Sequence, residues 1–440
     1  MMRKTTSFLI FLLIFWWSSA ACGKVYIDIN SPGFQKFPVA IPEFKNLGKA
    51  GAEDNLSAWF ADQLSRSLKI TGFFNIISKD AFLENQAGAG ITAGEIDFSD
   101  WSGIGSDFLV KGGFSYDGKK LAVEFRLFDT IEGKLIAGKK YWGKPEEKKA
   151  MVLKFADEIL IALTGGTGVF DTKIAFAGRK DNSSEIYTIN FDGSDPVKIT
   201  AYNSLTLLPH WSPDGSEISF TSYKDGNPDC YITNPASGKT KKISSFRGLN
   251  LPSSWSSDGR KILLVLSKDG NENIYIKHLD SGKLQRLTND RAIDVSPAWS
   301  PDGRKIAFVS NRSGSPQIFI MDSEGKNIRR LTFEGSYNSS PCWSPDGTRI
   351  AYEGSSNGRF QIFSIGENGD NLLQLTFKAG GGESPSWSPD GRYLVFSSKR
   401  GGRERIYVIN SNGLNPRVLP GIRGVKSFKS PSWSQHLNLY

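Results

Sequence analysis

The chain has few residues of the types that build metal centres, disulfide frameworks and histidine-based active sites. Its 440 residues include 3 Cys, 3 His and 4 Met. Three cysteines exclude a disulfide-stapled scaffold and a multi-cysteine metal site, and three histidines leave little room for histidine-rich catalysis. With 39% hydrophobic and 22% charged residues, the chain is neither disordered nor a multi-spanning membrane protein. What is abundant is Gly (46) and Trp (11), which favours a turn-rich binding protein over an enzyme.

Residues 1–21 have the pattern of an export signal. Arg3 and Lys4 precede an apolar run of ten residues, 8–17, and small residues follow at 18–21. A transmembrane helix needs about 20 apolar residues, so this run is too short for one. Export predicts a periplasmic protein.

Cys22 stands directly after this signal, and two interpretations of it stay open. Ordinary cleavage leaves Cys22 as the first mature residue. The tetrad 19–22 also has small residues before the cysteine, as in a lipid-attachment site, although Ser19 replaces the usual Leu. Lipidation of Cys22 would anchor the protein in the outer membrane.

The excess of positive charge belongs to the C-terminal part. The whole chain carries a formal charge of +9, residues 22–168 carry −1, and residues 169–440 carry +8, with 34 basic and 26 acidic residues. No basic cluster with interleaved aromatics is visible in the sequence, so we expect no nucleic-acid partner.

A five-residue motif repeats with a step of 44 residues. Trp-Ser-Pro-Asp-Gly, or Trp-Ser-Ser-Asp-Gly in the second copy, begins at Trp211, Trp255, Trp299, Trp343 and Trp387. An incomplete copy, Trp-Ser without the Asp-Gly, follows at 433–434. Each unit contains four short β runs separated by turns, which is the signature of a propeller blade. Pro and Asp-Gly suit a tight hairpin turn, and the Trp can fill the space between blades.

Six copies predict six blades. The strand near 173–177 opens the array without a Trp motif before it, and 430–433 is a lone final strand. We expect this last strand to complete the first blade, because a closed ring leaves no exposed sheet edge. The turn carboxylates are interpreted as structural and not as calcium ligands.

The region before the repeats predicts a compact α/β domain. Strands are expected at 25–29 and 39–41, and a meander at 108–110, 121–128 and 135–141. Helices are expected at 53–69 and from Pro145 to about 163, before the glycines at 165–166. The predicted fold is therefore an N-terminal α/β domain followed by a six-bladed β-propeller. Its divisions are a signal peptide at 1–21, the α/β domain at 22–165 and the propeller at 169–440.

The sequence lacks the common catalytic and cofactor motifs. There is no phosphate-binding loop, zinc ligand set or dinucleotide fingerprint, and no cofactor is expected. Residues 354–358 match G-x-S-x-G, but they lie between two predicted strands, whereas a nucleophile elbow joins a strand to a helix. Two alternatives to an adaptor stay open: a propeller lyase or hydrolase, and a lipoprotein that binds glycan or peptidoglycan through aromatic side chains in the channel.

Several stretches resemble the TolB family of the Tol–Pal system. They are the junction 156–176, the meander segment 123–129, and the Leu-Thr pairs that end three blades, at 287–288, 331–332 and 375–376. The resemblance covers nearly all of the mature chain. It implies a non-enzymatic periplasmic adaptor that links two partners, Pal (the peptidoglycan-associated lipoprotein) and TolA, and that acts in outer-membrane integrity and cell division. Outer-membrane proteins are a further class of partner that this role suggests. In some species of the family bacteriocins exploit the system for import.

The resemblance also implies two sets of binding residues. The family binds Pal through loops that precede the inner strands of the propeller. The matching positions are Leu249, Asn250, Leu251, Asp294, Val295, Asn338, Ser339 and Glu383. TolA binding is implied for the start of the mature chain, at Gly23, Lys24, Val25, Tyr26, Ile27 and Asp28.

Overall fold

The computed structural model describes residues 34–48, 54–83, 90–356, 358–377 and 380–437. The predicted signal peptide, Cys22, the expected strand 25–29 and the TolA-binding segment 23–28 lie outside the described residues. Among the helices within these ranges, none combines the length and the apolar character that crossing a membrane requires.

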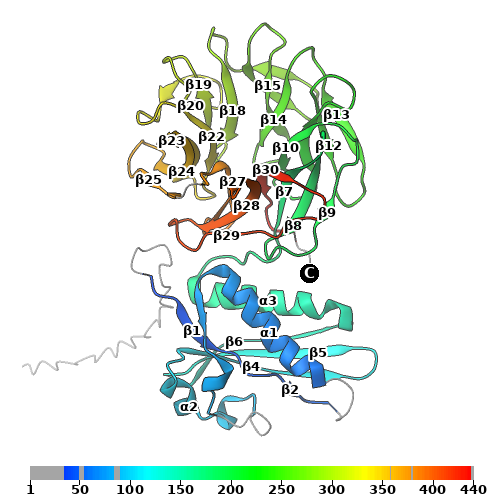
Figure 1. Ribbon diagram of the computed structural model, residues 1–440, viewed down its shortest axis with the longest axis vertical. Helices are drawn as coiled ribbons and strands as arrows, with labels where there is room; N and C mark the ends of the chain where they lie inside the picture. The colour runs from blue at the N-terminus through cyan, green and yellow to red at the C-terminus, as the bar shows by residue number, and fades with distance from the viewer. Residues whose placement is uncertain (1–33, 49–53, 84–89, 357, 378–379, 438–440) are drawn as a thin grey trace, which may run out of the picture.

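The N-terminal unit is a mixed β-sheet with helices packed on it (Figure 1). Its strand order is β3-β1-β4-β5-β6, with β2 paired to β4; β1 runs parallel to β3 and β4, and β4 to β6 form the predicted antiparallel meander. The elements are β1 (Phe37–Ala40), β2 (Lys45–Asn46), α1 (Asp54–Thr71), β3 (Phe74–Ile76), α2 (Phe98–Gly103), β4 (Phe108–Tyr116), β5 (Leu121–Asp129), β6 (Lys134–Gly143) and α3 (Lys148–Thr164).

Both predicted helices are present and are held by the expected features. In α1, Leu56, Phe60, Leu64 and Leu68 are 0–6% exposed and form one apolar face at helical spacing. Helix α3 ends at Gly165, whose φ of 71° gives the left-handed cap that glycine accepts without strain. The sequence did not predict β2, β3 or α2, which are only two to six residues long.

The C-terminal unit is a ring of six four-stranded antiparallel sheets (Figure 1). Each blade runs from an inner strand at the channel to an outer strand. Blade 1 is β30 (Ser427–Trp433), β7 (Lys173–Lys180), β8 (Ser183–Asn190) and β9 (Val197–Lys198); blade 2 is β10 (Thr206–Trp211), β11 (Ile218–Ser222), β12 (Asp229–Thr233) and β13 (Thr240–Ser244); blade 3 is β14 (Asn250–Trp255), β15 (Lys261–Leu266), β16 (Asn273–His278) and β17 (Leu284–Arg286). Blade 4 is β18 (Asp294–Trp299), β19 (Lys305–Ser310), β20 (Gln317–Asp322) and β21 (Arg329–Arg330); blade 5 is β22 (Asn338–Trp343), β23 (Arg349–Ser356), β24 (Arg359–Gly366) and β25 (Leu373–Gln374); blade 6 is β26 (Glu383–Trp387), β27 (Tyr393–Arg400), β28 (Arg403–Asn410) and β29 (Arg417–Val418).

The ring closes as the sequence predicts. The last strand, β30, pairs with β7, the first strand of the array, with Trp433 opposite Ile174. Blade 1 therefore combines the first and last segments of the propeller, and its inner strand comes from the end of the chain.

The repeated tryptophans lie between neighbouring blades. All six are 6–9% exposed and belong to clusters that join two blades; Trp299, for example, packs with Leu263 and Ile274 of blade 3. The indole N–H groups of Trp255, Trp343 and Trp387 donate to a backbone carbonyl of the preceding blade, as Trp343 does to that of Ala298 at 3.1 Å. The indole of Trp433 donates to the hydroxyl of Thr172, just before β7 of its own blade. The indole N–H groups of Trp211 and Trp299 have no hydrogen-bond partner among the described residues.

The two units share one buried core. A single apolar cluster contains Phe60 and Phe155 of the α/β unit together with Tyr393 and Trp433 of the propeller. At the boundary the rings of Phe73 and Tyr393 lie 5.5 Å apart, and Lys149 on α3 pairs with Asp192 at 3.0 Å. The α/β unit therefore packs on blades 6 and 1, at the end of the blades that carries the Asp-Gly turns.

Candidate functional site

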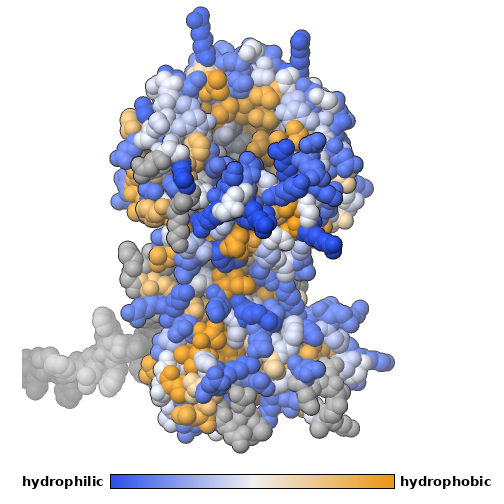
Figure 2. Space-filling model, viewed as in Figure 1, coloured by the Kyte–Doolittle hydropathy of each residue, from blue (hydrophilic) through white to orange (hydrophobic). Residues whose placement is uncertain are grey.

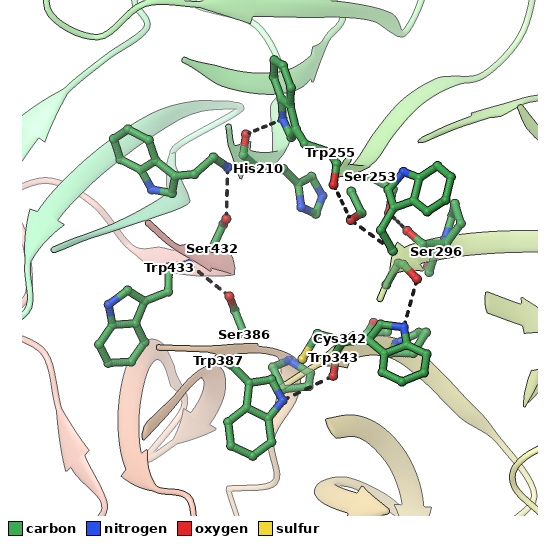
Figure 3. Close-up of a pocket in the computed structure, with 18 of the residues that line it drawn as sticks. His210, Ser253, Trp255, Ser296, Cys342, Trp343, Ser386, Trp387, Ser432 and Trp433 are labelled. Carbon is green, nitrogen blue, oxygen red and sulfur yellow. Dashed lines mark hydrogen bonds between the residues drawn. The ribbon is translucent and has the colours of Figure 1, made fainter. Parts of the chain in front are cut away.

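The six inner strands surround a cavity of about 620 Å³ along the ring axis (Figure 3). Its lining is mostly Ser, Pro and Trp, and the described residues that line it include no Asp, Glu, Lys or Arg. The ring of His210 is directed toward the channel, and burial lowers the pKa of this imidazole to about 4. The channel wall is therefore electrically neutral across the physiological pH range.

Each inner strand carries a β-bulge where it lines the channel. The ladder register shifts in all six blades within the three or four residues before the Trp. In five blades the residue before the Pro has a left-handed φ of 50–54°: Leu208, Ser296, Ser340, Ser384 and Ser430. In blade 3 that place is taken by Pro252, whose ring forbids a positive φ. Bulges of this kind redirect side chains and gather at functional sites.

One end of the ring carries two sets of loops. Turns between the second and third strands of each blade lie beside the loops that lead into the next inner strand. Hydrogen bonds join the sets: the amide of Leu249 donates to the hydroxyl of Ser267, and that of Ile293 to the side chain of Asn311. The two sets together form one surface, which we call the loop face.

Three of the residues predicted to contact Pal have buried side chains. Asn250, Asp294 and Asn338 are 0–2% exposed. The Asn250 side chain bonds the backbone of Phe246 and Gly248, and the Asp294 carboxylate accepts two bonds from Arg312 at 3.0 Å. Each of these side chains holds its own loop in place. That the three residues contact Pal directly stays a prediction. Ser339 is also buried, and its hydroxyl bonds Glu353.

The other predicted residues remain available. Leu251 and Val295 line the mouth of the channel, Leu249 is half-buried, and Glu383 is exposed. Although the residue as a whole is exposed, partial desolvation of the Glu383 carboxyl raises its pKa, and the nearby carboxylate of Glu353 adds to the shift.

The loop face carries exposed apolar side chains that the sequence analysis did not name. Phe333 and Phe377 are 73% and 74% exposed, and they directly follow the Leu-Thr pairs that end blades 4 and 5. Further members are Leu205, Phe246, Ile293 and Tyr337, at 39–44%. Figure 2 shows hydrophobic residues around the hollow at the centre of the propeller. The available sequence signal was the Phe that follows two of the three Leu-Thr pairs, those at 331–332 and 375–376.

Blades 6 and 1 make one sector of the loop face strongly basic. The hairpin β27–β28 brings Lys399 and Arg403 to the surface, and Lys180 and Arg423 are exposed beside them. None of these four has a carboxylate within 4.0 Å among the described residues. The hairpin and blade 1 are adjacent, because Glu404 pairs with Lys429 on β30 at 3.0 Å.

The described residues show no arrangement for metal or nucleophilic catalysis. No group of three or more His, Cys, Asp or Glu could hold a metal ion within these ranges. Ser355 and Ser356 of the G-x-S-x-G match end strand β23 and are followed by strand β24, so the turn required for a nucleophile elbow is not formed.

Family models match both parts of the chain. The model described as "TolB beta propeller domain" matches residues 161–437, which is more than half of the chain, and "TolB amino-terminal domain" matches residues 25–136.

Curated relatives and solved structures agree with the family models. The Tol-Pal system protein TolB of Syntrophus aciditrophicus is 48% identical over 44% of this chain and 44% of its own length, and that of Desulfosudis oleivorans is 40% identical over 43% of each. Each alignment thus spans less than half of the relative. The crystal structure of TolB from Acinetobacter baumannii superposes with a TM-score of 0.80 at 27% identity, over 91% of this chain and 97% of that one.

Proposed function

Because the chain belongs to the TolB family, we propose that it is a non-enzymatic periplasmic adaptor of the Tol–Pal envelope system, which binds Pal with its loop face and TolA with the start of its mature chain. The observation that carries this proposal is the loop face itself. It joins exposed aromatic side chains to a rigid ring, and such anchors supply most of the affinity in protein interfaces. The relatives are named for the Tol–Pal system and not for an enzyme.

The rigidity of the loop face supports docking of a folded partner. Asn250, Asp294 and Asn338 hold three loops from within, so little conformational entropy is lost when a partner binds. Within this face we assign Pal contacts to Leu249, Leu251, Val295 and Glu383 and to the exposed Phe333 and Phe377. Asn250, Asp294, Asn338 and Ser339 contribute by positioning the loops.

The mature N-terminal segment is the proposed TolA-binding site. Gly23 to Asp28 alternate polar and apolar residues in Lys-Val-Tyr-Ile-Asp, a pattern that suits addition of a strand to a partner's sheet edge. In this proposal the protein links an inner-membrane partner to a peptidoglycan-bound one. That link supports outer-membrane integrity and constriction during division.

Glycan binding is less well supported than protein docking. It would need aromatic faces open to the channel, but the six repeat tryptophans are 6–9% exposed between blades. The large exposed aromatic residues of the propeller that the structure describes lie on the loops instead, where a protein surface can reach them.

Binding of the soluble domain of Pal from the same genome, measured by isothermal titration calorimetry, tests the proposal. Phe333→Ser combined with Phe377→Ser should weaken binding at least tenfold. Ile131→Ser is the matched control, because Ile131 is equally exposed, at 77%, but lies on the hairpin between β5 and β6. Deletion of residues 23–28 should abolish TolA binding and leave Pal binding intact. Absence of Pal binding by the unmodified mature protein would overturn the proposal.

A further inference from the structure

The repeated turn places an Asp at the same position in five blades, so the surroundings of these five carboxylates can be compared. Asp214, Asp258, Asp302 and Asp346 are exposed. A hydrogen bond from the serine hydroxyl two positions earlier lowers the pKa of Asp258 and of Asp302. The equivalent Asp390 in blade 6 has a side chain that is 0% exposed, and burial raises its pKa. Asp390 is thus the one turn carboxylate of the five that is buried, because the α/β unit covers the turn of blade 6.

Arg392 connects this buried turn to the α/β unit. Its guanidinium donates to the carbonyl of Thr164 at 3.0 Å and to that of Thr167 at 3.4 Å, at the end of α3 and in the segment that follows. Its nearest nitrogen is 3.9 Å from Oδ2 of Asp390, too far for a hydrogen bond. Oδ2 of Asp390 therefore has no hydrogen-bond partner among the described residues.

Two further carboxylates and a histidine meet at the same junction. Asp157 on α3 accepts hydrogen bonds from the amides of Val169 (2.7 Å) and Phe170 (3.1 Å), which begin the propeller. Nδ1 of His436, close to the C-terminus, lies 2.6 Å from Oδ1 of Asp171. Nε2 of His436 is buried and, like Oδ2 of Asp390, has no partner within the described ranges.

The charges at this junction balance when His436 is charged and one of the three carboxylates is protonated. With Asp157 protonated and His436 charged, the carboxylates of Asp171 and Asp390 face two cations, His436 and Arg392. Loss of both protons leaves three carboxylates facing Arg392 alone. Repulsion among charges in a partly buried site is poorly screened, so the second state favours separation of the packed surfaces.

We propose that Asp157, Asp171, Asp390, Arg392 and His436 form a proton-dependent latch, which packs the α/β unit more tightly on the propeller when Asp157 and His436 are protonated. The latch is specific to blade 6, where the turn carboxylate is covered. It works without a ligand and responds to the pH around the protein.

The pKa shifts agree with this direction. Burial raises the pKa of Asp157 to about 7, and the hydrogen bond to Asp171 raises that of His436. A group whose pKa is raised by folding holds its proton in the folded protein after the unfolded chain has released it. Stability therefore falls as pH rises, from about 4 to about 7 for Asp157 and through the raised pKa for His436.

The other ionisable groups facing the latch do not oppose this direction. From β6, Tyr141 faces Asp157, and burial raises its pKa, so it stays neutral. The neighbouring Glu158 on α3 is already paired, with Lys139 at 3.0 Å. Tyr393 beside Asp390 is fully buried, and its pKa is raised as well.

Calorimetric melting of the mature protein between pH 5.5 and 8.5 tests the latch. The melting temperature should fall by roughly 5 °C over this range, and Asp157→Asn or His436→Gln should remove at least half of the fall. The matched controls are Asp346→Asn, the exposed copy of the turn carboxylate in blade 5, and His278→Gln on blade 3. Both should retain the wild-type fall. Full retention by Asp157→Asn and His436→Gln would overturn the proposal.

Amide exchange in the wild-type protein gives a second measurement that needs no variant. The amides of Val169 and Phe170 lie where the two units meet, and the ionised Asp157 carboxylate is by itself their stronger acceptor. Separation of the packed surfaces at high pH should nevertheless lower their protection, corrected for intrinsic exchange, at least tenfold from pH 6 to pH 8.5. Protection that does not change with pH would overturn the latch even if Asp157→Asn failed to fold.

Discussion

The phenol hydroxyl of Tyr393 in blade 6 donates a hydrogen bond of 3.1 Å to the backbone carbonyl of Thr71 at the end of α1. Tyr393 is 1% exposed, and its ring also packs on Phe73 of the α/β unit. One side chain thus supplies both apolar and polar contact across the boundary between the two units.

Tyr393→Phe should destabilise the protein by about 1–2 kcal/mol, because it leaves a buried carbonyl without its donor. The melting temperature measured by calorimetry should fall by a few degrees. Tyr352→Phe is the control, since Tyr352 is 3% exposed and its hydroxyl makes no hydrogen bond among the described residues. Equal losses in the two variants would contradict the prediction.

A comparison of two repeat tryptophans measures how much one hydrogen bond contributes to the free energy of unfolding. Trp343 and Trp299 are both 8% exposed, but only the Trp343 indole has an acceptor, the carbonyl of Ala298. Replacement by Phe removes similar apolar area at both sites, so Trp343→Phe should cost about 1 kcal/mol more than Trp299→Phe. Urea unfolding of both variants checks the difference, and the opposite order would show that packing outweighs the bond.

The basic sector of the loop face should make Pal binding depend on salt. Lys399→Glu combined with Arg403→Glu should weaken binding at least tenfold at low ionic strength and flatten its dependence on salt concentration. Lys239→Glu with Lys283→Glu makes the same change of charge on turns at the opposite end of the ring and should have little effect. Equal weakening by the two pairs would mean that only net charge matters.

His210 should make the protein sensitive to acid. Its pKa is lowered to about 4 by burial, so the unfolded chain takes up a proton that the folded protein refuses between about pH 6.5 and 4. Stability should fall by on the order of 2 kcal/mol as the pH drops through that window. His210→Gln should remove this loss in chemical denaturation experiments, whereas His278→Gln should keep it. The sign is opposite to that expected for Asp157 and His436.

The repeat predicted most of the architecture. Five Trp-Ser-x-Asp-Gly turns at a 44-residue step and a sixth Trp-Ser pair without Asp-Gly predict the number of blades, and the unpaired final strand predicts closure. Local pattern was also enough for α1, α3 and the meander, because their apolar faces are long. It was not enough for β2, β3 and α2, because two to six residues are too few to show a periodic pattern and these elements depend on packing against the rest of the unit.

The functional residues were harder to predict, because their roles depend on side-chain direction and on contacts with residues far away in the sequence. Asn250, Asp294 and Asn338 stand at the start of the inner strands, but the sequence cannot tell that their side chains point back to bond their own loops. Asp390 has the same neighbours in sequence as the other turn carboxylates and differs only in what covers it. That cover comes from residues more than 200 positions away, which no local pattern records.

The pairing of β30 with β7 also constrains the order in which the protein folds. Trp433 and Ile174 are separated by almost the whole length of the propeller. Blades 2 to 6 consist of consecutive strands and can form locally, whereas blade 1 must wait until the last strand has emerged, and it then closes a very long loop. We expect closure of the ring to be the slow folding step, during which the edge of β7 is open to incorrect pairing with other chains.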